Sequence, residues 1–188
     1  ELLATKGRAL DGASVAVSGA GNVAIYAIEK AQQLGAKVVT ASDSSGVIYD
    51  PDGIKLEALK RIKLERRGRI HEYLDEVPGQ AEFREDATSV WDIPVDVALP
   101  CATQNEIDAP HAKRLIRNGC LCVAEGANMP NTAAAIEIYR ETPGMLFGPA
   151  KAANSGGVAT SALEMQQNAS RDSWSFEHTE SRLEDIMR

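Results

Sequence analysis

The sequence predicts an α/β fold built on a doubly wound, mostly parallel sheet. Short apolar runs typical of buried strands alternate along the chain with segments of helical period, and no repeat or low-complexity segment interrupts them. A glycine-rich turn, GAGNVA, stands between the first predicted strand and the first predicted helix. Successive strands then end in polar loops, at the sheet edge where open α/β folds bind ligands.

The first unit of the chain is the one around which the others are organised. It consists of a strand over residues 14–18, a GxGxxA pattern at Gly19, Gly21 and Ala24, a helix over 22–34 ended by Gly35, and a strand over 37–42 closed by Asp43. The first glycine permits the sharp turn, the second lets the backbone approach a diphosphate, and the small third residue lets helix and sheet pack closely. The helix N-terminus favours an anion. We therefore expect a Rossmann-like dinucleotide site. The alternative is a βαβ unit whose glycines serve packing only.

The remaining elements follow in order, each from its own pattern. In the first half of the chain we expect a helix end over residues 1–10 near Gly7, a β segment at 47–49 with a turn at 50–53, a basic helix at 55–68, a short helix at 70–74 and an irregular region at 75–92. A buried parallel strand at 95–99 follows, then a helix at 108–118 capped by Asp108, a strand at 121–125 and a helix to about 140 capped by Asn131 or Thr132. The last elements expected are a strand at 145–147, a loop, a helix from about Gly157 and an amphipathic helix at 173–188.

Composition narrows the class of protein. The 188 residues suit one domain or slightly more, and 44% hydrophobic with 25% charged residues is typical of a soluble globular protein. A net charge of −7 does not favour a nucleic-acid or anionic-membrane partner. No signal peptide and no run of roughly 18 apolar residues is present, so we expect a cytoplasmic protein. Because the chain begins at Glu1 without a methionine, we interpret it as a fragment of something longer.

The thiols and imidazoles do not form a metal-binding pattern. The cysteines are odd in number, lack a CxxC spacing and lie in or beside apolar runs, so we expect buried free thiols in a reducing compartment at Cys101, Cys120 and Cys122. The histidines are far apart in sequence and are interpreted as surface or packing residues: His71, His111 and His178. We predict no metal.

The helix over 55–68 is strongly basic in an acidic protein. One interpretation is an ordinary solvated helical face. The other is that Lys63 and Arg66 reach a 2′-phosphate on the cofactor, because lysine and arginine are its usual partners. Asp43 alone favours NAD, since a carboxylate accepts from a free 2′-hydroxyl and repels a phosphate. With Ser44 and the two cations beside it, we predict a preference for NADP.

Asparagine-bearing loops follow three successive strands. They contain Asn105, Asn128 and Asn154. A single amide in such a loop most often forms a cap or a turn. Three of them on one sheet edge favour a site that binds ribose hydroxyls or a neutral amide, since amide side chains both donate and accept.

Four stretches, SGAGNVAIYAIEKAQQLGAKVVTASDSSG, ALPCATQNEI, AEGANMP and PAKAANSGGVATSALEMQQN, resemble hexameric NADP-linked glutamate dehydrogenases over nearly the whole chain. The resemblance implies oxidative deamination of L-glutamate to 2-oxoglutarate and ammonia, and it covers only the cofactor-binding domain. It also implies the following site residues: Gly19, Gly21, Asn22 and Val23 at the diphosphate, Asp43 and Ser44 at the adenosine ribose, Ala102, Thr103 and Asn105 at the inner edge, Asn128 at the nicotinamide, and Asn154, Val158 and Ser161 at the substrate.

The same resemblance implies what this chain lacks. The lysine and aspartate of the reaction belong to an upstream domain, and the chemistry needs such a lysine of lowered pKa and a positioned carboxylate. We therefore expect cofactor binding without turnover, and no catalytic residue within 1–188. The domains expected are a connecting helix end at 1–12, the dinucleotide-binding domain at 13–170 and a truncated helix at 171–188. Partners expected are the upstream domain and, in the full-length enzyme, a homo-hexamer.

Two other functions stay open at this point. One is an NAD-linked dehydrogenase of leucine, phenylalanine or valine, in which the basic helix is not expected and the position of Ser161 would face an apolar side chain. The other is a nucleotide-sensing or assembly module that has no reaction of its own.

Overall fold

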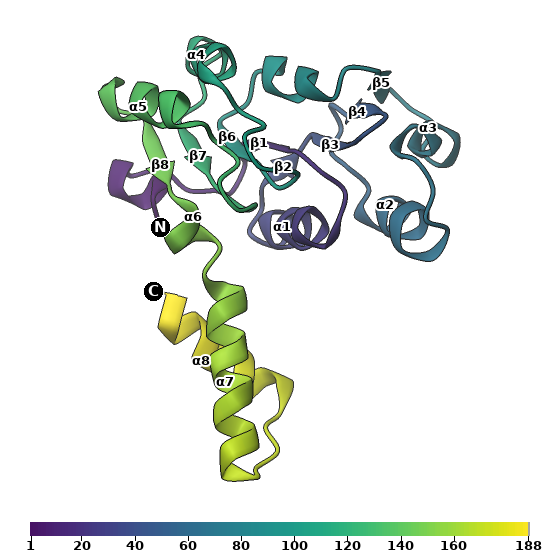
Figure 1. Cartoon of the computed structure of the whole chain (residues 1–188). Helices are drawn as coiled ribbons and strands as arrows, with labels where there is room; N and C mark the ends of the chain where they lie inside the picture. Colours follow the sequence, from purple (N-terminus) through teal and green to yellow (C-terminus); the bar gives the residue numbers. More distant parts are fainter. Residues whose placement is uncertain (188) are drawn as a thin grey trace.

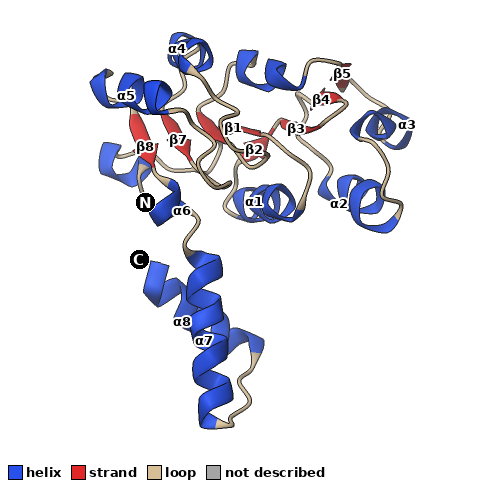
Figure 2. Ribbon diagram, in the orientation of Figure 1, coloured by secondary structure: helices blue, strands red, loops and turns tan. Residues whose placement is uncertain are grey.

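In the computed structural model, which describes residues 1–187, a five-stranded parallel sheet is covered on both faces by helices and is followed at one end by a small antiparallel sheet (Figures 1 and 2). The strands are β1 (Ser14–Val17), β2 (Lys37–Val38), β3 (Thr40–Asp43), β4 (Gly46–Tyr49), β5 (Glu82–Arg84), β6 (Val97–Leu99), β7 (Cys122–Ala124) and β8 (Leu146–Gly148). The α-helices are α1 (Asn22–Gln33), α2 (Leu56–Lys60), α3 (Tyr73–Glu76), α4 (Ala109–Arg117), α5 (Ala133–Glu141), α6 (Ala150–Ala153), α7 (Gly156–Ser170) and α8 (Phe176–Met187).

The strand order of the parallel sheet creates a switch point. The order is β2-β1-β6-β7-β8, and each neighbouring pair is parallel. The chain winds from β1 towards β2 and later from β6 towards β8, so the direction reverses between β1 and β6. Ligands of open α/β sheets bind beyond the carboxyl ends of the two strands at such a point. The predicted fold class is therefore confirmed.

The two-residue period of β1 divides the core between the two faces of the sheet. Val15 and Val17 belong to the apolar cluster that includes α1, whereas Ala16 belongs to the cluster that includes α4 and α5. Alternating side chains point to opposite faces, and all three are fully buried. A strand buried on both faces reads as a continuous apolar run, which is why the sequence pattern predicted it correctly.

Helices α4 and α5 begin at capping side chains. Asp108 caps α4, with Oδ1 accepting a hydrogen bond of 3.0 Å from the backbone N–H of His111. Of the two residues predicted to cap α5, Thr132 does so, through a hydrogen bond of 3.3 Å from the N–H of Ala135. Each cap satisfies an N–H group that the first helical turn leaves without a partner.

The strand predicted over 37–42 is two strands, and this prediction was wrong in its continuity. Residues 37–38 pair with β1, but residues 40–43 leave the parallel sheet and pair antiparallel with β4. The cause is Thr40, whose Oγ1 accepts from the N–H of Val17 at 2.8 Å and donates to its carbonyl at 3.0 Å. A side chain thus takes the place of the backbone ladder, and the two chains diverge.

The other differences between the predicted and the observed elements are in short segments. The predicted basic helix is α2 followed by a π-helical turn at Arg61–Glu65, and the region 75–92, expected to be irregular, contains β5 and a 3₁₀ turn at Ala87–Asp92. β5 forms because it completes the edge of β4, which a three-residue pattern does not reveal. Two further 3₁₀ turns lie at Leu3–Lys6 and Ile70–Glu72, the first ending at Gly7 as expected.

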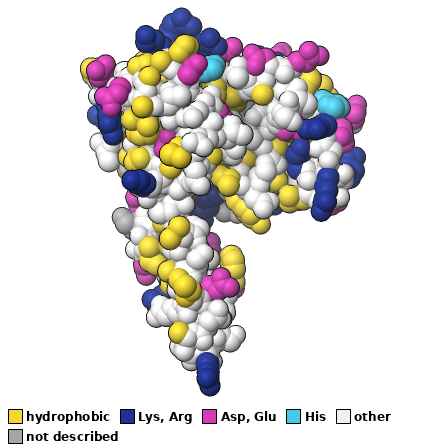
Figure 3. Space-filling model, viewed as in Figure 1, with side chains coloured by type: hydrophobic (Ala, Val, Ile, Leu, Met, Phe, Trp, Pro, Cys, Tyr) yellow, Lys and Arg dark blue, Asp and Glu magenta, His cyan; other side chains and the backbone are white. Residues whose placement is uncertain are grey.

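The C-terminal part is a helical hairpin that projects from the rest of the molecule (Figure 1). α7 begins at Gly156, close to the predicted start, and the preceding segment contains α6 where a loop was expected. The last predicted helix is α8, and Arg188 lies outside the described residues. Hydrophobic side chains appear on the hairpin surface (Figure 3); the large exposed ones are Val158, Met165, Phe176 and Ile186.

The prediction about the cysteines can be compared with the structure. The three cysteines are buried free thiols, as expected. Among the described residues, no helix is long and apolar enough to cross a membrane.

Candidate functional site

The glycine turn after β1 requires its first glycine for two separate reasons. Gly19 has φ +86°, a conformation that costs other residues energy, and a Cβ there would lie 3.0 Å from the carbonyl oxygen of Cys101. Gly21 precedes α1 with an extended backbone, and a Cβ there would meet nothing within 4 Å. Asn22 and Val23 of the first turn of α1 line a cavity, and a helix N-terminus at such a position is an arrangement that binds phosphate groups.

The turn is held rigidly from both sides. The N–H of Gly19 donates to Oγ of Ser42 at 2.8 Å, and the N–H of Ser42 donates to the carbonyl of Gly19 at 3.1 Å. On the other side, Oγ of Ser18 accepts a hydrogen bond of 2.9 Å from the N–H of Cys101. The turn is thereby fixed between β3 and the end of β6.

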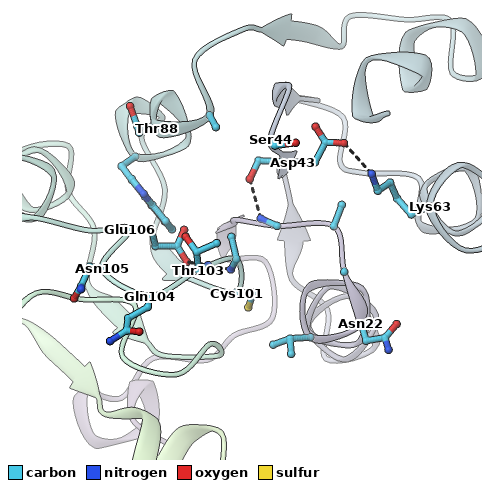
Figure 4. A pocket seen from close by; sticks show the side chains of 18 of the residues that line it. Asn22, Asp43, Ser44, Lys63, Thr88, Cys101, Thr103, Gln104, Asn105 and Glu106 are labelled. Atoms are coloured by element: carbon cyan, nitrogen blue, oxygen red, sulfur yellow. Dashed lines mark hydrogen bonds and ion pairs between the residues drawn. The ribbon is translucent and has the colours of Figure 1, made fainter. Parts of the chain in front are cut away.

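A cavity of about 940 Å³ opens at this point, beyond the carboxyl ends of β1 and β6 (Figure 4). Ten of the predicted cofactor-binding residues line it: Gly19, Gly21, Asn22, Val23, Asp43, Ser44, Lys63, Ala102, Thr103 and Asn105. Residues that were not predicted also line it, including Leu64, Ala87, Thr88, Trp91, Glu106 and His111. Thr88 and Trp91 come from the region that was expected to be irregular, so the sequence offered no signal for them.

The carboxylate of Asp43 is fully occupied by internal donors. Lys63 Nζ lies 2.8 Å from Oδ2, which also accepts from the N–H of Ile70 at 3.0 Å. Ser45 donates to Oδ1 through both its N–H and its hydroxyl, at 2.8 and 2.6 Å. Burial by itself raises the pKa of Asp43, but the hydrogen bonds from Lys63, Ser45 and Ile70 outweigh it and hold the pKa at about 2. Asp43 is therefore an ionised anchor for Lys63.

Two arginines of this region, Arg66 and Arg69, have different partners. Arg66, predicted to contact the cofactor, forms ion pairs with Glu76 and Glu72 and lies outside the cavity lining. Arg69, which was not predicted, donates from Nη1 to Oγ of Ser44 at 2.7 Å. Within residues 1–187, Arg69 forms no ion pair. Arg69 likewise lies outside the cavity lining, but its partner Ser44 lines the cavity, so a hydrogen bond connects Arg69 to the lining.

The loop after β6 is shaped by a carboxylate that sequence reasoning missed. Oε1 of Glu106 accepts from the N–H groups of Ala102 and Thr103, at 3.0 and 3.2 Å. Figure 4 shows this side chain beside Thr103, in the wall of the cavity. Burial raises the pKa of Glu106, while hydrogen bonds from Ser18, Ala102 and Thr103 act in the opposite direction. The only signal in the sequence is a Glu placed just after loop N–H groups, a common local pattern.

The asparagines of the next two loops contact one another. Asn154 Nδ2 lies 3.1 Å from Oδ1 of Asn128 and 3.2 Å from the carbonyls of Gly126 and Ala127. Both asparagines lie outside the cavity lining, in the loop after β7 and at the end of α6. The structure therefore brings Asn128 and Asn154 together, next to the wall formed by Asn105, whose N–H donates to the carbonyl of Met129 at 2.9 Å.

The last two predicted residues lie on the first turns of α7. Val158 is exposed, and the hydroxyl of Ser161 donates to the carbonyl of Gly157 at 3.1 Å within the helix. Neither lines the cavity. The predicted substrate side is thus a helix face that continues away from the cleft.

A comparison with family models identifies one match. Residues 1–188 match the model described as Glutamate/Leucine/Phenylalanine/Valine dehydrogenase. The match covers the whole sequence, so the cleft and the helical hairpin both lie within it.

Individual relatives agree with this match. The chain is 50% identical over 193 residues to the NADP-specific glutamate dehydrogenase of Helicobacter pylori strain J99, covering 100% of this chain and 43% of that protein. It is 50% identical over 190 residues to the NAD(P)-specific glutamate dehydrogenase of Xylanibacter ruminicola, covering 100% and 42%. The crystal structure of Plasmodium falciparum glutamate dehydrogenase has a TM-score of 0.92 at 42% identity, covering 99% of this chain and 40% of that one. The chain thus spans less than half the length of these relatives.

Proposed function

Because the chain belongs to the Glutamate/Leucine/Phenylalanine/Valine dehydrogenase family, we propose that it is the cofactor-binding part of an NADP-linked glutamate dehydrogenase. The whole enzyme would oxidatively deaminate L-glutamate to 2-oxoglutarate and ammonia. The observation that supports this proposal most strongly is the Gly19–Gly21 turn, which opens at the switch point between β1 and β6 into the cleft.

The residues present fit a dinucleotide. The close approach at Gly19 leaves no room for a side chain, and the open space beside Gly21 is bounded by the N-terminus of a twelve-residue helix. Backbone N–H groups of Asn22 and Val23 would bind the diphosphate there, favoured by the helix dipole. When bound, the nicotinamide ring supplies the hydride acceptor of the reaction.

The adenosine end favours a 2′-phosphate. Ser44 and Arg69 are hydrogen-bonded to one another beside the cavity, and the negative charge of Asp43 is compensated by Lys63. Arginine binds phosphate through two donors in a fixed fork, so Arg69 with Ser44 would hold the 2′-phosphate. Because Asp43 has no oxygen free of donors, its usual role of accepting from a 2′-hydroxyl is weakened.

The chemistry of the substrate would take place at the opposite end. Asn128 and Asn154 lie where the second mononucleotide half of the sheet ends, and the first turns of α7 carry Val158 and Ser161. We propose that these residues face nicotinamide and glutamate once a further part of the polypeptide closes over them. That part would supply the lysine and carboxylate of the reaction, and the complete enzyme would assemble as a hexamer.

Dual cofactor use is a second candidate, favoured by the NAD(P)-specific relative at 50% identity. Titration of the chain with NADPH and NADH, followed by cofactor fluorescence, separates the two cases. We expect NADPH to bind at least tenfold more tightly, since each charged hydrogen bond contributes about 1.5–3 kcal/mol. Equal affinities would favour dual use, and tighter NADH binding would refute the NADP preference.

The chain by itself is expected to bind cofactor without turnover. The assay is NADPH production with excess L-glutamate, with the full-length enzyme as positive control. Glutamate-dependent production by the chain alone would refute this part of the proposal.

A further inference from the structure

We infer that Glu125 is a positioning residue for the nicotinamide half of the site, and that its buried carboxylate holds the loop of Asn128 and the segment of Asn154 in one geometry. The inference rests on the proposed function, because it assigns that half of the site to the nicotinamide. Glu125 follows β7 directly and is 4% exposed.

Both carboxylate oxygens of Glu125 are occupied, and each by a different segment. Oε1 accepts from Nδ2 of Asn131 at 2.8 Å and from its N–H at 3.4 Å. Oε2 accepts from the N–H of Ala150, the first residue of α6, at 2.7 Å. One side chain therefore joins the far end of the loop 126–130 to the N-terminus of α6.

A second set of hydrogen bonds, made by Asn154, holds the same loop. α6 is a single four-residue turn, and Asn154 at its end donates to the carbonyls of Gly126 and Ala127 and to Oδ1 of Asn128. Glu125 thus holds the far end of the loop, at Asn131, and Asn154 holds its first three residues. α6 acts as a short rigid spacer between the two contacts.

The orientation of Asn131 is set by a further buried group. The hydroxyl of Tyr139 donates to Oδ1 of Asn131 at 3.1 Å, and this directs the Nδ2 group towards Glu125. Tyr139 is 1% exposed and lies on α5. A chain of buried hydrogen bonds therefore connects α5, the loop and α6, and such networks are costly to leave partly satisfied.

Topology places the loop at the nicotinamide end. The diphosphate turn follows β1 and the adenosine-binding Ser44 follows β3, so the second mononucleotide belongs to the half formed by β6, β7 and β8. The loop is also fastened next to the cavity wall, because the N–H groups of Gly126 and Ala127 donate at 3.0 and 2.9 Å to the carbonyl of Pro100, the residue before Cys101 of the cavity lining. Movement of the loop would therefore alter the wall at that end.

The Glu125→Gln substitution tests the role of the charge with little change in volume. A glutamine replaces one carboxylate oxygen with an NH₂ group, so either Asn131 or Ala150 loses its acceptor and faces another donor. The ligands are NADPH, which spans both halves of the site, and adenosine 2′,5′-bisphosphate, which fills only the adenosine half. Glu137→Gln is the matched control, since Glu137 is an exposed carboxylate on α5 that pairs with Arg140.

We expect Glu125→Gln to weaken NADPH binding about tenfold and to leave the bisphosphate affinity within about twofold. Tyr139→Phe, which keeps the ring and removes only the hydroxyl, should weaken NADPH binding about threefold with the same selectivity. If the Glu125→Gln variant does not fold, the Tyr139→Phe variant tests the inference in its place. Glu137→Gln should change neither affinity.

If the affinities for NADPH and for the bisphosphate fell equally, Glu125 would serve general stability. If the folded variants kept their NADPH affinity, Glu125 would not position the nicotinamide half of the site. Either result overturns the inference while leaving the proposed function intact. Failure of the unaltered chain to bind either ligand would instead remove the proposed function, and this inference with it.

Discussion

The ammonium of Lys63 lies 2.8 Å from Oδ2 of Asp43, and the two side chains are 17% and 11% exposed. They were expected to favour different cofactors, one by repelling a 2′-phosphate and the other by binding it. In the structure their charges compensate one another at the rim of the cleft (Figure 4). Under the proposed function, we therefore expect cofactor choice to depend on the next pair, Ser44 and Arg69.

Arg69→Ala is predicted to reduce the preference for NADPH. The affinity for NADPH should fall about tenfold or more, because a charged hydrogen bond of about 1.5–3 kcal/mol is lost, whereas NADH affinity should change less than about twofold. Fluorescence titration with both cofactors measures this. Arg66→Ala is the matched control, since Arg66 is already paired with Glu76. If Arg66→Ala were the more harmful change, the assignment of the phosphate contact to Arg69 would be wrong.

Asp43 is predicted to make stability depend on pH in acid. Its pKa is lowered from 3.8 to about 2, so the ionised form stabilises the fold above pH ~4 and this contribution is lost as pH falls towards 2. Asp43→Asn should therefore lower the free energy of unfolding by about 2 kcal/mol at pH 6, with the difference from the unaltered chain disappearing near pH 2. Urea denaturation across this range measures it, with the exposed Asp185→Asn as control. A difference that does not vary with pH would contradict the ion pair.

Substitution of the two glycines of the turn is predicted to have different effects, on stability at Gly19 and on NADPH binding at Gly21. Gly19→Ala should lower stability by about 1–2 kcal/mol from its positive φ alone, and hence the melting temperature by about 2–8 °C. Gly21→Ala should fold normally, since no atom obstructs a Cβ there, but should weaken NADPH binding by occupying the space beside the diphosphate. Thermal denaturation and NADPH titration of both variants distinguish the roles. Unchanged binding by Gly21→Ala would remove that glycine from the site.

The three cysteines are predicted to be unreactive in the folded chain. Burial raises the pKa of the Cys101 and Cys120 thiols to about 12 and that of Cys122 to about 11, so little thiolate, the reactive form, is present at pH 8. Alkylation by iodoacetamide should be slow until guanidinium is added. A cysteine introduced at exposed Ser173 provides the reference rate. Rapid labelling of a native cysteine would show that its segment opens readily.

Much of the fold could be predicted because its signals are local. The turn at Gly19 is determined by backbone conformation, the cap at Asp108 by a side chain three residues from its partner, and β1 by a run that is apolar on both faces. The cleft could be located for the same reason, since residues that follow parallel strands must meet at one edge of the sheet. Ten predicted residues accordingly line one cavity.

The sequence by itself thus determined the parallel sheet, the position of the cleft and its glycine turn. Tertiary structure alone decided which charges meet: Lys63 with Asp43, Arg66 with Glu76, and Arg69 with Ser44. It also decided where the second strand ends, through the hydroxyl of Thr40, and how Glu125 connects two loops. The physical reason is that these contacts form between groups that are close in space, and partners ten or more residues apart leave no periodic signal in the sequence.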